Sequence, residues 1–574
     1  MTASRWWDSP HHSVEGELAY FAEAGLDFAL DRELFETAEV VRFDGELRCG
    51  SKTSPATVIY PPAYDAGQHP LVVVPNLDIG RHRSPNGALC LDHPVLGELA
   101  PMCGAEAVQR AERLWLLWET DRSRLHEEEA DAPDPWGNYV EYAAETAVLV
   151  DLPAEPQLGE RGYLHVSLAS LEPLRGSLVR LRQTHPSPLE LIAPPATSTV
   201  LSGTREIQGV WQRLEAPPPD PMLPSLHGWL LGEQEALLTR ALSYARSHPD
   251  PEMPALLGFI YPDEGPERGQ YHDTWLFLVI SPGGVLQAPR PVALRGDETW
   301  IRQPGLTPLA QRSVAILGVG ALGSQIAALL ARAGVANFLL VDSDVLSPGN
   351  RVRHELDLAD VGRFKTAALG DRLRRINPGC EVTERPQRLG GLMAPMLSAV
   401  QAGDDALAAQ LAAADLIVNA SADTAAGFHC SKIARHAGTS VLHSWVGPGA
   451  WGARVLIQRS GDEPSGCTEC LARWQEEEQG NIQVPSLAAD PTPGEVIEAG
   501  CADPSFTGSG FELSAAAAAA ARVAVQVLGE GCNVEYPSAD FDLLSLDFRG
   551  LDSAHPTSQH SRLPIHPECS ICHG

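Results

Sequence analysis

Residues Ser313–Gly323 read SVAILGVGALG, an apolar run that leads into the pattern Gly-x-Gly-x-x-Gly. The apolar run predicts a buried strand, and the glycines predict a tight turn from that strand into a helix. Glycine lets the backbone approach a ligand closely, and free N–H groups at a helix N-terminus bind phosphate. This stretch therefore predicts an α/β sheet with a nucleotide site built on Gly318, Gly320 and Gly323.

Further strand-like segments follow at the spacing of a parallel sheet with covering helices. They are Phe338–Val341, Leu416–Asn419 and Val441–Trp445. Asp342 comes directly after the first of them, 19 positions beyond Gly323, where an acidic side chain can bind the hydroxyl groups of a ribose. The glycines and this aspartate alone describe an NAD-dependent dehydrogenase equally well, so they leave the nucleotide open.

Residues Asp342–Lys365 read DSDVLSPGNRVRHELDLADVGRFK, with an Asp, then Asn-x-x-Arg, then a Lys after a Gly. This ordered set resembles the adenylating domain shared by ubiquitin-activating enzymes, the ThiF family and the molybdopterin-synthase adenylyltransferase. The resemblance implies a Rossmann-like domain that binds ATP. It implies that Asp342 binds the ribose, that Arg353 and Lys365 bind the triphosphate, and that Asn350 belongs to the same site.

A later segment, Asp415–Asp423, reads DLIVNASAD and matches the place of the family's magnesium-binding aspartate. The resemblance implies that Asp423 binds Mg²⁺. Attack on the α-phosphate builds charge that fixed cations stabilise, so Arg353, and Asp423 through the Mg²⁺ that it is expected to bind, are also candidate catalytic residues. The chain departs from the family at His354, where the family usually has Gln.

Two Cys-x-x-Cys pairs lie far apart in the chain. Cys467 and Cys470 form the first pair, and Cys569 and Cys572 form the second, 98 residues further on. Each pair can hold one tetrahedral Zn²⁺ through two thiolates, and four thiolates close its coordination sphere. The four cysteines predict a structural zinc site that ties the C-terminus to the sheet domain, with redox pairs or unrelated thiols as the alternative.

Cys501 lies between the first cysteine pair and an alanine-rich segment, Ala515–Ala521, that predicts a helix. In the family this stretch crosses above the nucleotide and can carry the acceptor cysteine. The resemblance therefore implies that the Cys501 thiolate attacks the acyl-adenylate and expels AMP. Cys430 and Cys532 are weaker candidates for the same role.

The N-terminal segment carries a second resemblance, to ubiquitin-conjugating enzymes. Tyr60–Tyr64 reads YPPAY, like their turn after the meander, and Asn86–Asp92 reads NGALCLD, like the segment around their catalytic cysteine. The resemblance implies that Cys90 receives the acyl group and that His82, eight residues earlier, takes the place of the asparagine that stabilises the oxyanion. The alternative for Cys90 is a buried cysteine that acts as a small apolar side chain.

The length of 574 residues is too great for one core and predicts about three domains. Residues 1–150 are expected to form an α+β, conjugating-enzyme-like domain that opens with a helix over 15–30. Residues 151–295 are expected to form a connecting α/β domain, and residues 296–574 the adenylating domain.

Composition limits the partners and the compartment. The formal net charge of −32 argues against nucleic acid as the main partner, since an acidic surface repels phosphate. The N-terminus has no apolar signal core, and the longest apolar run is broken by Arg522, so neither secretion nor a membrane span is expected. Eleven cysteines without a signal sequence then predict a cytoplasmic protein with reduced thiols. Lysine is rare, with three against 39 arginines (42 − 3).

The order of the segments resembles the fused ubiquitin-transfer enzymes of bacterial anti-phage operons of the CBASS type. The resemblance implies that the activated carboxylate is the C-terminus of a cGAS-like nucleotidyltransferase, which is then joined to a target amine. It also implies a homodimer. The alternatives are a bacterial ubiquitin-like protein as the donor, a sulfur-carrier adenylyltransferase, a dehydrogenase, and a scaffold without catalysis.

Overall fold

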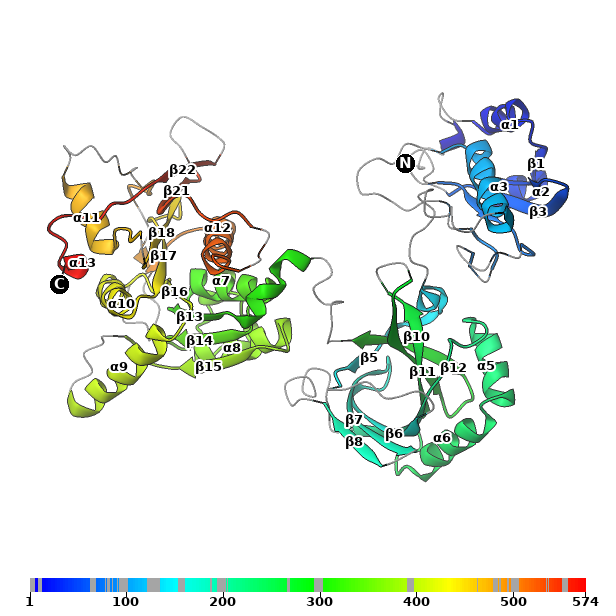
Figure 1. Cartoon of the computed structure of the whole chain (residues 1–574), viewed down its shortest axis with the longest axis horizontal. Helices are drawn as coiled ribbons and strands as arrows, with labels where there is room; N and C mark the ends of the chain where they lie inside the picture. Colours follow the sequence, from blue (N-terminus) through cyan, green and yellow to red (C-terminus); the bar gives the residue numbers. More distant parts are fainter. Residues whose placement is uncertain are drawn as a thin grey trace. The chain divides into compact units, whose positions relative to one another are not determined.

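The computed structural model divides the chain into two compact units, Met1–Ala293 and Leu294–Gly574 (Figure 1). The structure describes residues 6–8, 13–61, 69–77, 79, 83–84, 86–89, 91, 102–120, 135–152, 160–185, 188–193, 203, 205–265, 269–293, 303–389, 397–461, 463–477, 484, 487–492, 495–496, 505–532, 534, 536–549 and 556–573. At residues 8, 185, 304, 397–404, 495–496 and 505–506 it describes the backbone alone.

The first sheet of the N-terminal unit is an antiparallel meander of four strands. The strands follow one another in chain order: β1 (Phe28–Leu30), β2 (Arg42–Cys49), β3 (Lys52–Ile59) and β4 (Leu71–Val73). A two-residue turn joins β2 to β3, and Gly50 provides a left-handed backbone there with a φ of 60°. The helices of this part are α1 (Val14–Glu23), α2 (Arg32–Ala38) and α3 (Gly104–Thr120).

The opening helix is shorter than the sequence predicts. The helix expected over residues 15–30 ends at Glu23, because Gly25 adopts a φ of 71° and the chain then turns into β1. Within α1, the buried carboxylate of Glu17 accepts hydrogen bonds from the Tyr60 hydroxyl at 2.5 Å and from the Gly104 N–H at 3.0 Å. Glu17 therefore satisfies one of the open N–H groups at the start of α3.

The second sheet of this unit has eight strands in the order β5-β12-β11-β10-β9-β6-β7-β8. The strands are β5 (Tyr142–Val150), β6 (Arg161–Ser170), β7 (Arg175–His185), β8 (Leu189–Ile192), β9 (Arg205–Arg213), β10 (Ala255–Glu264), β11 (Tyr271–Ile280) and β12 (Leu286–Ala293). An additional parallel pairing of β5 with β7 closes seven of these strands into a ring. Residues 151–295, expected as an α/β connection, thus form mostly a closed β-sheet with two helices, α5 (Leu223–Gly232) and α6 (Glu235–Ser247).

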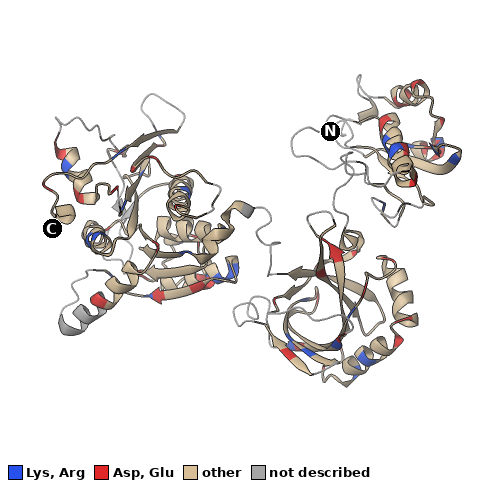
Figure 2. Cartoon of the chain, in the orientation of Figure 1, with Lys and Arg blue, Asp and Glu red and all other residues tan. Residues whose placement is uncertain are grey.

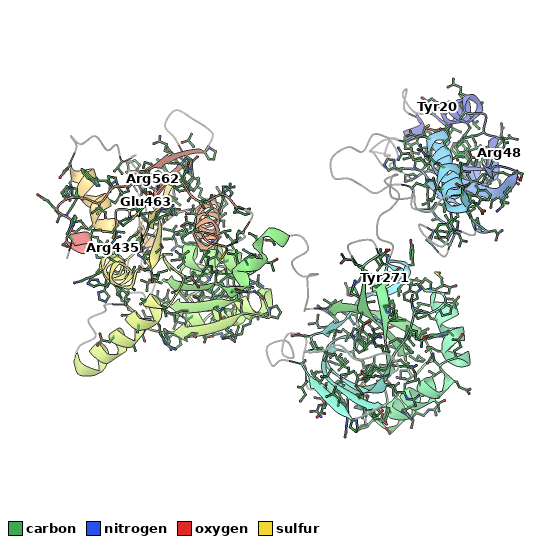
Figure 3. The ribbon with its side chains drawn as sticks, viewed as in Figure 1. Tyr20, Arg48, Tyr271, Arg435, Glu463 and Arg562 are labelled. Atoms are coloured by element: carbon green, nitrogen blue, oxygen red, sulfur yellow. The ribbon has the colours of Figure 1, made fainter. Side chains whose placement is uncertain are left out.

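Strand β10 explains the continuous apolar pattern of this segment. Leu256 and Ile260 belong to a core cluster that draws on β5, β6, β7, β9 and β11 and fills the ring (Figure 3). Leu257 and Phe259 belong to a second cluster beneath α5 and α6. The strand is therefore buried on both faces and does not alternate between apolar and polar residues.

The C-terminal unit is a Rossmann-like α/β sheet, as the sequence predicts. Its strand order is β15-β14-β13-β16-β17-β18-β21-β22, with parallel pairing from β15 to β17 and antiparallel pairing beyond. The strands are β13 (Ser313–Leu317), β14 (Asn337–Val341), β15 (Glu381–Arg385), β16 (Leu416–Asn419), β17 (Ser440–Val446), β18 (Gly452–Gln458), β21 (Leu543–Asp547) and β22 (Thr557–Ser561). The chain order reverses at β13, and ligands bind such sheets outside the carboxyl ends of the strands at that point.

Helices cover both faces of this sheet. One core cluster unites α7 (Ala321–Arg332), α8 (Lys365–Ile376) and α12 (Gly510–Leu528), and another unites α9 (Leu397–Ala412) and α10 (Thr424–Ala437). At the edge strand β15, Arg374 of α8 pairs with Glu384 at 3.1 Å, and Figure 2 shows both signs of charge along this edge. Charged side chains protect an open sheet edge from pairing with other chains.

Helix α12 is the one described helix that is long and apolar enough to cross a membrane by length and composition. Twelve of its residues are buried in the core, among them Ala516, Ala517, Ala520 and Ala524. This small-residue face lets α12 pack closely on α7, and the two helices lie side by side in Figure 1. Its burial identifies α12 as a core helix, and the alanine run is helical as predicted.

Candidate nucleotide and metal sites

The three motif glycines differ in what surrounds each of them. Gly318 adopts a φ of 81°, and a Cβ there would lie 2.4 Å from the Cα of Ser421. A Cβ on Gly323 would lie 1.9 Å from the carbonyl oxygen of Gly318, which no side chain can tolerate. A Cβ on Gly320, the N-cap of α7, would meet nothing within 4 Å, so the start of the helix faces open space. This is the arrangement that lets a phosphate reach helical N–H groups.

Asp342 stands at the carboxyl end of β14 and is tied to the glycine loop. One of its carboxylate oxygens accepts the Val319 N–H at 2.8 Å, and the other accepts the Asp344 N–H at 2.8 Å. Burial raises the pKa of Asp342 above its ordinary value, although the nearby Lys365 ammonium opposes that rise. Asp342 is thereby fixed beside the glycines, where the sequence places the ribose.

Lys365 already has a carboxylate partner. Its ammonium donates to Asp344 Oδ2 at 2.8 Å, and Lys365 is buried at the start of α8. Asp344 was not among the predicted site residues, although it stands two positions after Asp342 in the motif. The pair keeps the Lys365 charge compensated at the same edge of the sheet.

The loop after β14 places Asn350 and Arg353 in and beside a short 3-10 helix, Asn350–Val352. Asn350 Oδ1 accepts the Ser347 N–H at 3.2 Å, which fixes the turn. Gln325 of α7 donates from Nε2 to the Arg353 carbonyl at 3.0 Å. The backbone of Arg353, one of the two predicted triphosphate residues, is thus attached to the helix that follows the glycine loop.

His354, the departure from the family pattern, is a neutral bridge between two loops. Its Nδ1 accepts the Leu356 N–H at 3.1 Å, so Nε2 carries the proton and donates to the Val319 carbonyl at 2.7 Å. Burial lowers the pKa of His354 to about 4, which keeps this tautomer uncharged at neutral pH. The uncharged His354 side chain thus joins the loop after β14 to the glycine loop through hydrogen bonds.

Asp423 lies at the carboxyl end of β16, as the N-cap of α10. Its Oδ1 accepts the N–H groups of Ala425 at 2.9 Å and Ala426 at 3.2 Å. Its Oδ2 accepts from both Nε and Nη2 of Arg388, at 3.0 and 2.7 Å. Burial alone would raise the pKa of Asp423, but the Arg388 hydrogen bond and the helix N–H groups hold it below its usual value.

A buried polar chain lies beneath this aspartate. Asn419 Nδ2 donates to His443 Nδ1 at 3.1 Å, so His443 Nε2 carries the proton and donates to Ser431 Oγ at 3.1 Å. Ser431 Oγ lies 3.3 Å from Thr468 Oγ1, next to the first cysteine pair. At the other end, Asn419 Oδ1 accepts the Ser421 hydroxyl at 2.8 Å. Hydrogen bonds thus connect the loop of Asp423 with the helix that begins after Cys467.

All eight predicted nucleotide-site residues lie at one edge of the sheet, on the loops after β13, β14 and β16 and in the first turns of α7 and α8. They are Gly318, Gly320, Gly323, Asp342, Asn350, Arg353, Lys365 and Asp423. Their binding and catalytic roles stay predictions. Sequence reasoning missed Arg388, because nothing in its neighbourhood marks it apart from its place after β15.

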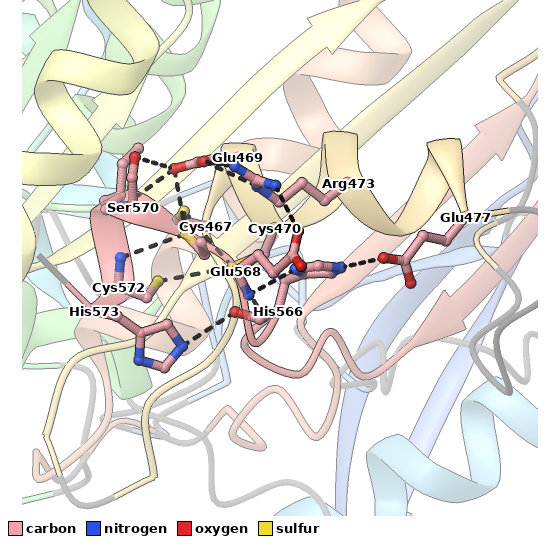
Figure 4. A network of polar contacts seen from close by, with 12 residues as sticks. Cys467, Glu469, Cys470, Arg473, Glu477, His566, Glu568, Ser570, Cys572 and His573 are labelled. Carbon is pink, nitrogen blue, oxygen red and sulfur yellow. Dashed lines mark hydrogen bonds and ion pairs between the residues drawn. The ribbon is translucent and has the colours of Figure 1, made fainter.

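The two cysteine pairs, 98 residues apart in sequence, meet in space (Figure 4). The sulfur of Cys467 lies 3.9 Å from that of Cys470 and 3.5 Å from that of Cys569, and Cys470 lies 3.7 Å from Cys572. A tetrahedron with Zn–S bonds of about 2.3 Å places its sulfurs about 3.8 Å apart. The cluster therefore has the size that one zinc ion requires.

Donors around the cluster suit thiolates. The His566 N–H donates to Cys470 Sγ at 3.3 Å, and the Cys572 N–H donates to Cys569 Sγ at 3.4 Å. Arg435 of α10, labelled in Figure 3, donates from Nη2 to Cys572 Sγ at 3.3 Å. Four thiolates with one Zn²⁺ carry excess negative charge, which N–H donors and an arginine offset.

Glu469 holds the short C-terminal helix α13 (Ser570–His573) against α11 (Thr468–Glu476). Its Oε2 accepts the Ser570 hydroxyl at 2.8 Å and the Ile571 N–H at 3.1 Å (Figure 4). Burial alone would raise the pKa of Glu469, but these bonds and the one from Arg473 lower it to about 2. An ionised carboxylate at a helix N-terminus is favourable, so the second cysteine pair is positioned even before a metal binds.

The predicted acceptors Cys90 and Cys501, and His82, lie outside the described residues. The segment before Cys90 is hydrogen-bonded to the β4 strand, since the Leu89 N–H donates to the Val72 carbonyl at 2.9 Å. Before Cys501, Asp490 donates its N–H to the Pro448 carbonyl at 2.9 Å.

The segment around Cys501 is attached to one turn at both ends. After Cys501, Gly508 forms a bridge with Gly449 in the same turn between β17 and β18 that holds Asp490. Between these attachments, β19 (Glu495–Val496) pairs with β20 (Ser505–Phe506) in antiparallel register. The described flanks of Cys501 therefore form a hairpin-like arm.

The two weaker acceptor candidates are placed unfavourably. Cys430 is fully buried in α10, and burial raises its pKa to about 12, so it forms no thiolate at neutral pH. Cys532 accepts a hydrogen bond from Arg312 Nη2 at 2.7 Å. Arg312 precedes β13, so Cys532 lies at the amino end of the strands, opposite the glycine loop.

Comparison with known proteins shows similarity to one protein family and to several bacterial proteins. The ThiF family matches residues 298–559. An uncharacterized protein of Sinorhizobium fredii, y4oA, is 28% identical over 530 residues, which cover 83% of each chain. The ATP-dependent ubiquitin transferase-like protein Cap2 of Pseudomonas aeruginosa is 27% identical over 217 residues, which cover 36% of this chain and 35% of Cap2.

The match to a shorter enzyme is more complete. The molybdopterin-synthase adenylyltransferase of Escherichia coli is 30% identical over 202 residues, which cover 34% of this chain but 70% of that enzyme. The ThiF family match, over residues 298–559, includes the glycine loop, Asp342 and Lys365. On these grounds this protein belongs to the ThiF family and is an adenylating enzyme of the bacterial ThiF type.

Proposed function

We propose that this protein uses MgATP to activate the C-terminal carboxylate of a partner protein as an acyl-adenylate. One observation carries the proposal. The glycine loop, Asp342, the buried Lys365 and Asp423 all lie where the strand order reverses, in a chain of the ThiF family. Ligands bind α/β sheets at this point.

Each group has a role that follows from its place. The N-terminus of α7 and Gly320 receive the phosphates, and Asp342 binds the ribose hydroxyl groups. Arg353 and Lys365, with Asn350 shaping their loop, bind the triphosphate and stabilise the charge that builds as the carboxylate oxygen attacks the α-phosphorus. Pyrophosphate leaves as the bond between the α-phosphorus and its bridging oxygen breaks. Mg²⁺ held by Asp423 would neutralise the phosphate oxygens.

The four-cysteine cluster is proposed to hold a structural Zn²⁺. The sulfur spacing and the N–H donors fit that ion, and a closed set of four thiolates leaves no open position for catalysis. The ion would join α11 to the C-terminal helix α13, on the side of the polar chain that leads to Asp423.

The later steps are proposed from the resemblance. The Cys501 thiolate attacks the acyl-adenylate and releases AMP, and Cys90 then takes the acyl group by thioester exchange. A target amine attacks that thioester to form the amide, with His82 stabilising the oxyanion. The described arm around Cys501 supports the first transfer, because both its ends are fixed to the unit that carries the nucleotide loop.

The proposed setting is anti-phage defence in the cytoplasm, as a homodimer, with a cGAS-like nucleotidyltransferase as the carried protein. Similarity to the Cap2 relative supports this setting. A bacterial ubiquitin-like protein is the alternative donor. A sulfur-carrier adenylyltransferase is the other candidate, supported by the match to the molybdopterin-synthase enzyme. Membership of the ThiF family argues against the dehydrogenase alternative.

Intact-mass analysis tests the order of steps. The purified protein and each candidate donor are incubated with MgATP, and donor-dependent exchange between ATP and labelled pyrophosphate is measured in parallel. Cys501→Ala is expected to keep the exchange but carry no thioester. Cys90→Ala is expected to hold a thiol-sensitive adduct on Cys501 and form no amide. Exchange lost equally in Cys501→Ala would contradict adenylation before thiol transfer.

A further inference from the structure

Arg388 occupies the carboxylate that the proposed function assigns to a metal ion. Asp423 Oδ1 is occupied by two helical N–H groups, and Oδ2 accepts two bonds from the Arg388 guanidinium. A cation that binds Asp423 must approach one of these oxygens. The Arg388 contact is the one that can yield, because the helix N–H groups belong to the backbone of α10.

The position of Arg388 places it at the nucleotide edge. It follows β15 by three residues, yet its partner follows β16, and two strands, β14 and β13, lie between them in the sheet. Neighbouring strands are about 4.8 Å apart, so the segment after β15 must cross the carboxyl ends of β14 and β13. Leu389 confirms this path, since it is buried in one cluster with Leu317, Val341 and Ala426.

The ion pair is weak enough to exchange. The Arg388 side chain is 52% exposed, so solvent screens its attraction to Asp423 and competes for its N–H groups. The guanidinium keeps its charge at every physiological pH and forms paired hydrogen bonds with phosphate as readily as with carboxylate. Once Asp423 binds a metal ion, Arg388 loses its carboxylate partner. In the proposed function, the triphosphate bound at this edge is an anion that can replace that partner.

We propose that Arg388 is a phosphate-binding residue that exchanges Asp423 for the ATP triphosphate when MgATP binds. In the nucleotide-free protein it neutralises Asp423, and in the complex it neutralises phosphate. The inference rests on the proposed function, since it needs an adenine nucleotide at this edge.

Binding calorimetry tests the exchange without turnover. The probes are AMPCPP with Mg²⁺, whose α,β-linkage resists cleavage, and adenosine, which has no phosphate. Arg388→Gln is expected to weaken AMPCPP binding about tenfold or more, the range of a charge-assisted contact, and to leave adenosine binding unchanged. Arg388→Lys is expected to fall between wild type and Arg388→Gln, because it keeps the charge and loses the paired geometry.

Arg332→Gln is the matched control. Arg332 is a similarly exposed arginine, at 45%, and it pairs with Glu355 at 3.1 Å at the end of α7, away from Asp423. It is expected to bind AMPCPP like the wild type. Wild-type AMPCPP affinity in Arg388→Gln, or an equal loss of adenosine binding, would overturn the inference.

A second variant predicts an effect of the opposite sign. Asp423→Asn keeps the helix cap, because asparagine caps as well as aspartate, but it loses the charge that holds Arg388. In buffer without divalent metal, Asp423→Asn should bind AMPCPP several-fold more tightly than wild type, and the added change Arg388→Gln should abolish that gain. Absence of the gain would refute the exchange. Failure of the wild type to bind any adenine nucleotide would refute the proposed function as well.

Discussion

The cysteine cluster and the nucleotide edge are two polar sites of one unit, and they are prepared for their ligands in different ways. The four sulfurs already lie at the spacing of a zinc ion, with N–H and arginine donors aimed at them. At the nucleotide edge the charges compensate one another, with Lys365 on Asp344 and Arg388 on Asp423. The proposed zinc ion would complete the first site, whereas the proposed nucleotide and its metal ion would displace existing partners in the second. We infer from this difference that a metal ion at the cysteine cluster can stabilise the fold. A nucleotide at the other site can change which side chains form ion pairs.

Loss of the Lys365 ammonium should produce the largest effect. Lys365→Ala removes a fixed cation proposed to stabilise the charge on the triphosphate, and donor-dependent ATP–pyrophosphate exchange should fall about 10²–10³-fold. Lys432→Ala is the control, because Lys432 is exposed on α10. Near-normal exchange in Lys365→Ala would show that the Lys365–Asp344 pair serves the fold alone.

Removal of two thiols of the cysteine cluster should lower both the zinc content and the thermal stability of the protein. The double change Cys569→Ser and Cys572→Ser should reduce zinc from one ion per chain to none and lower Tm by roughly 5–10 °C, since metal ligation contributes to folding. Metal analysis and calorimetry measure both quantities, with Cys532→Ser as a control thiol outside the cluster. Full metal content in the double variant would place the ion elsewhere.

Acid should weaken the nucleotide loop through His354. Its folded pKa is lowered to about 4 from 6.5, so it stabilises the fold above pH 6.5, and that stability is lost as the pH falls from 6.5 towards 4. His443 has its pKa lowered to about 4 by burial and titrates in the same window. The two histidines together should therefore lower the unfolding free energy between pH 7 and pH 4.5, and each should account for about half of that decrease. In His354→Gln the decrease should be smaller by about 2 kcal/mol.

Chemical denaturation at both pH values checks this, with His560→Gln as the control because His560 is exposed on β22. An unchanged pH dependence in His354→Gln would mean that the pKa of His354 is the same in the folded and the unfolded protein.

The polar chain between the two sites should show the smallest effect. Ser431→Ala leaves the His443 Nε2–H without its acceptor, and a buried unpaired donor costs about 1–3 kcal/mol of unfolding free energy. Ser514→Ala, an exposed serine of α12, is the control. If the chain also positions Asp423, Ser431→Ala should raise the Mg²⁺ concentration needed for half-maximal exchange, while zinc content stays at one. Equal stability of the two variants would show that the hydrogen bond from His443 to Ser431 does not stabilise the fold.

The grouping of the predicted nucleotide-site residues at one edge of the sheet could be predicted from the sequence because its signals are local. Glycines with special backbone needs, an acid after a strand and a Lys after a Gly all lie within one stretch of chain. The Lys365–Asp344 and Arg388–Asp423 pairs were missed because they depend on which loops the sheet brings together. No spacing in the sequence shows that the loop after β15 crosses two strands to reach the loop after β16.

The fold shows the same limit. The parallel order around β13 follows from strand–helix repeats, whereas closure of the ring depends on a pairing of β5 with β7 that no local pattern encodes. Residues 15–30 show the local counterpart, where apolar periodicity continued past Gly25 but the glycine's positive φ ended the helix. Periodicity predicts elements well, and long-range hydrogen bonds decide how those elements connect.

The arm that carries Cys501 has a kinetic consequence. Only residues 497–504 separate Val496 from Ser505, which stand opposite each other across β19 and β20. Since a chain extends by at most about 3.6 Å per residue, the four residue steps that join Cys501 to Ser505 in sequence span at most about 14 Å. A reactant confined in this way meets a target within its reach at an effective concentration of millimolar or more, whatever the protein concentration. Small thiols dissolved at lower concentrations would then compete poorly for the proposed adenylate, and the first acyl transfer would stay within the chain by proximity alone.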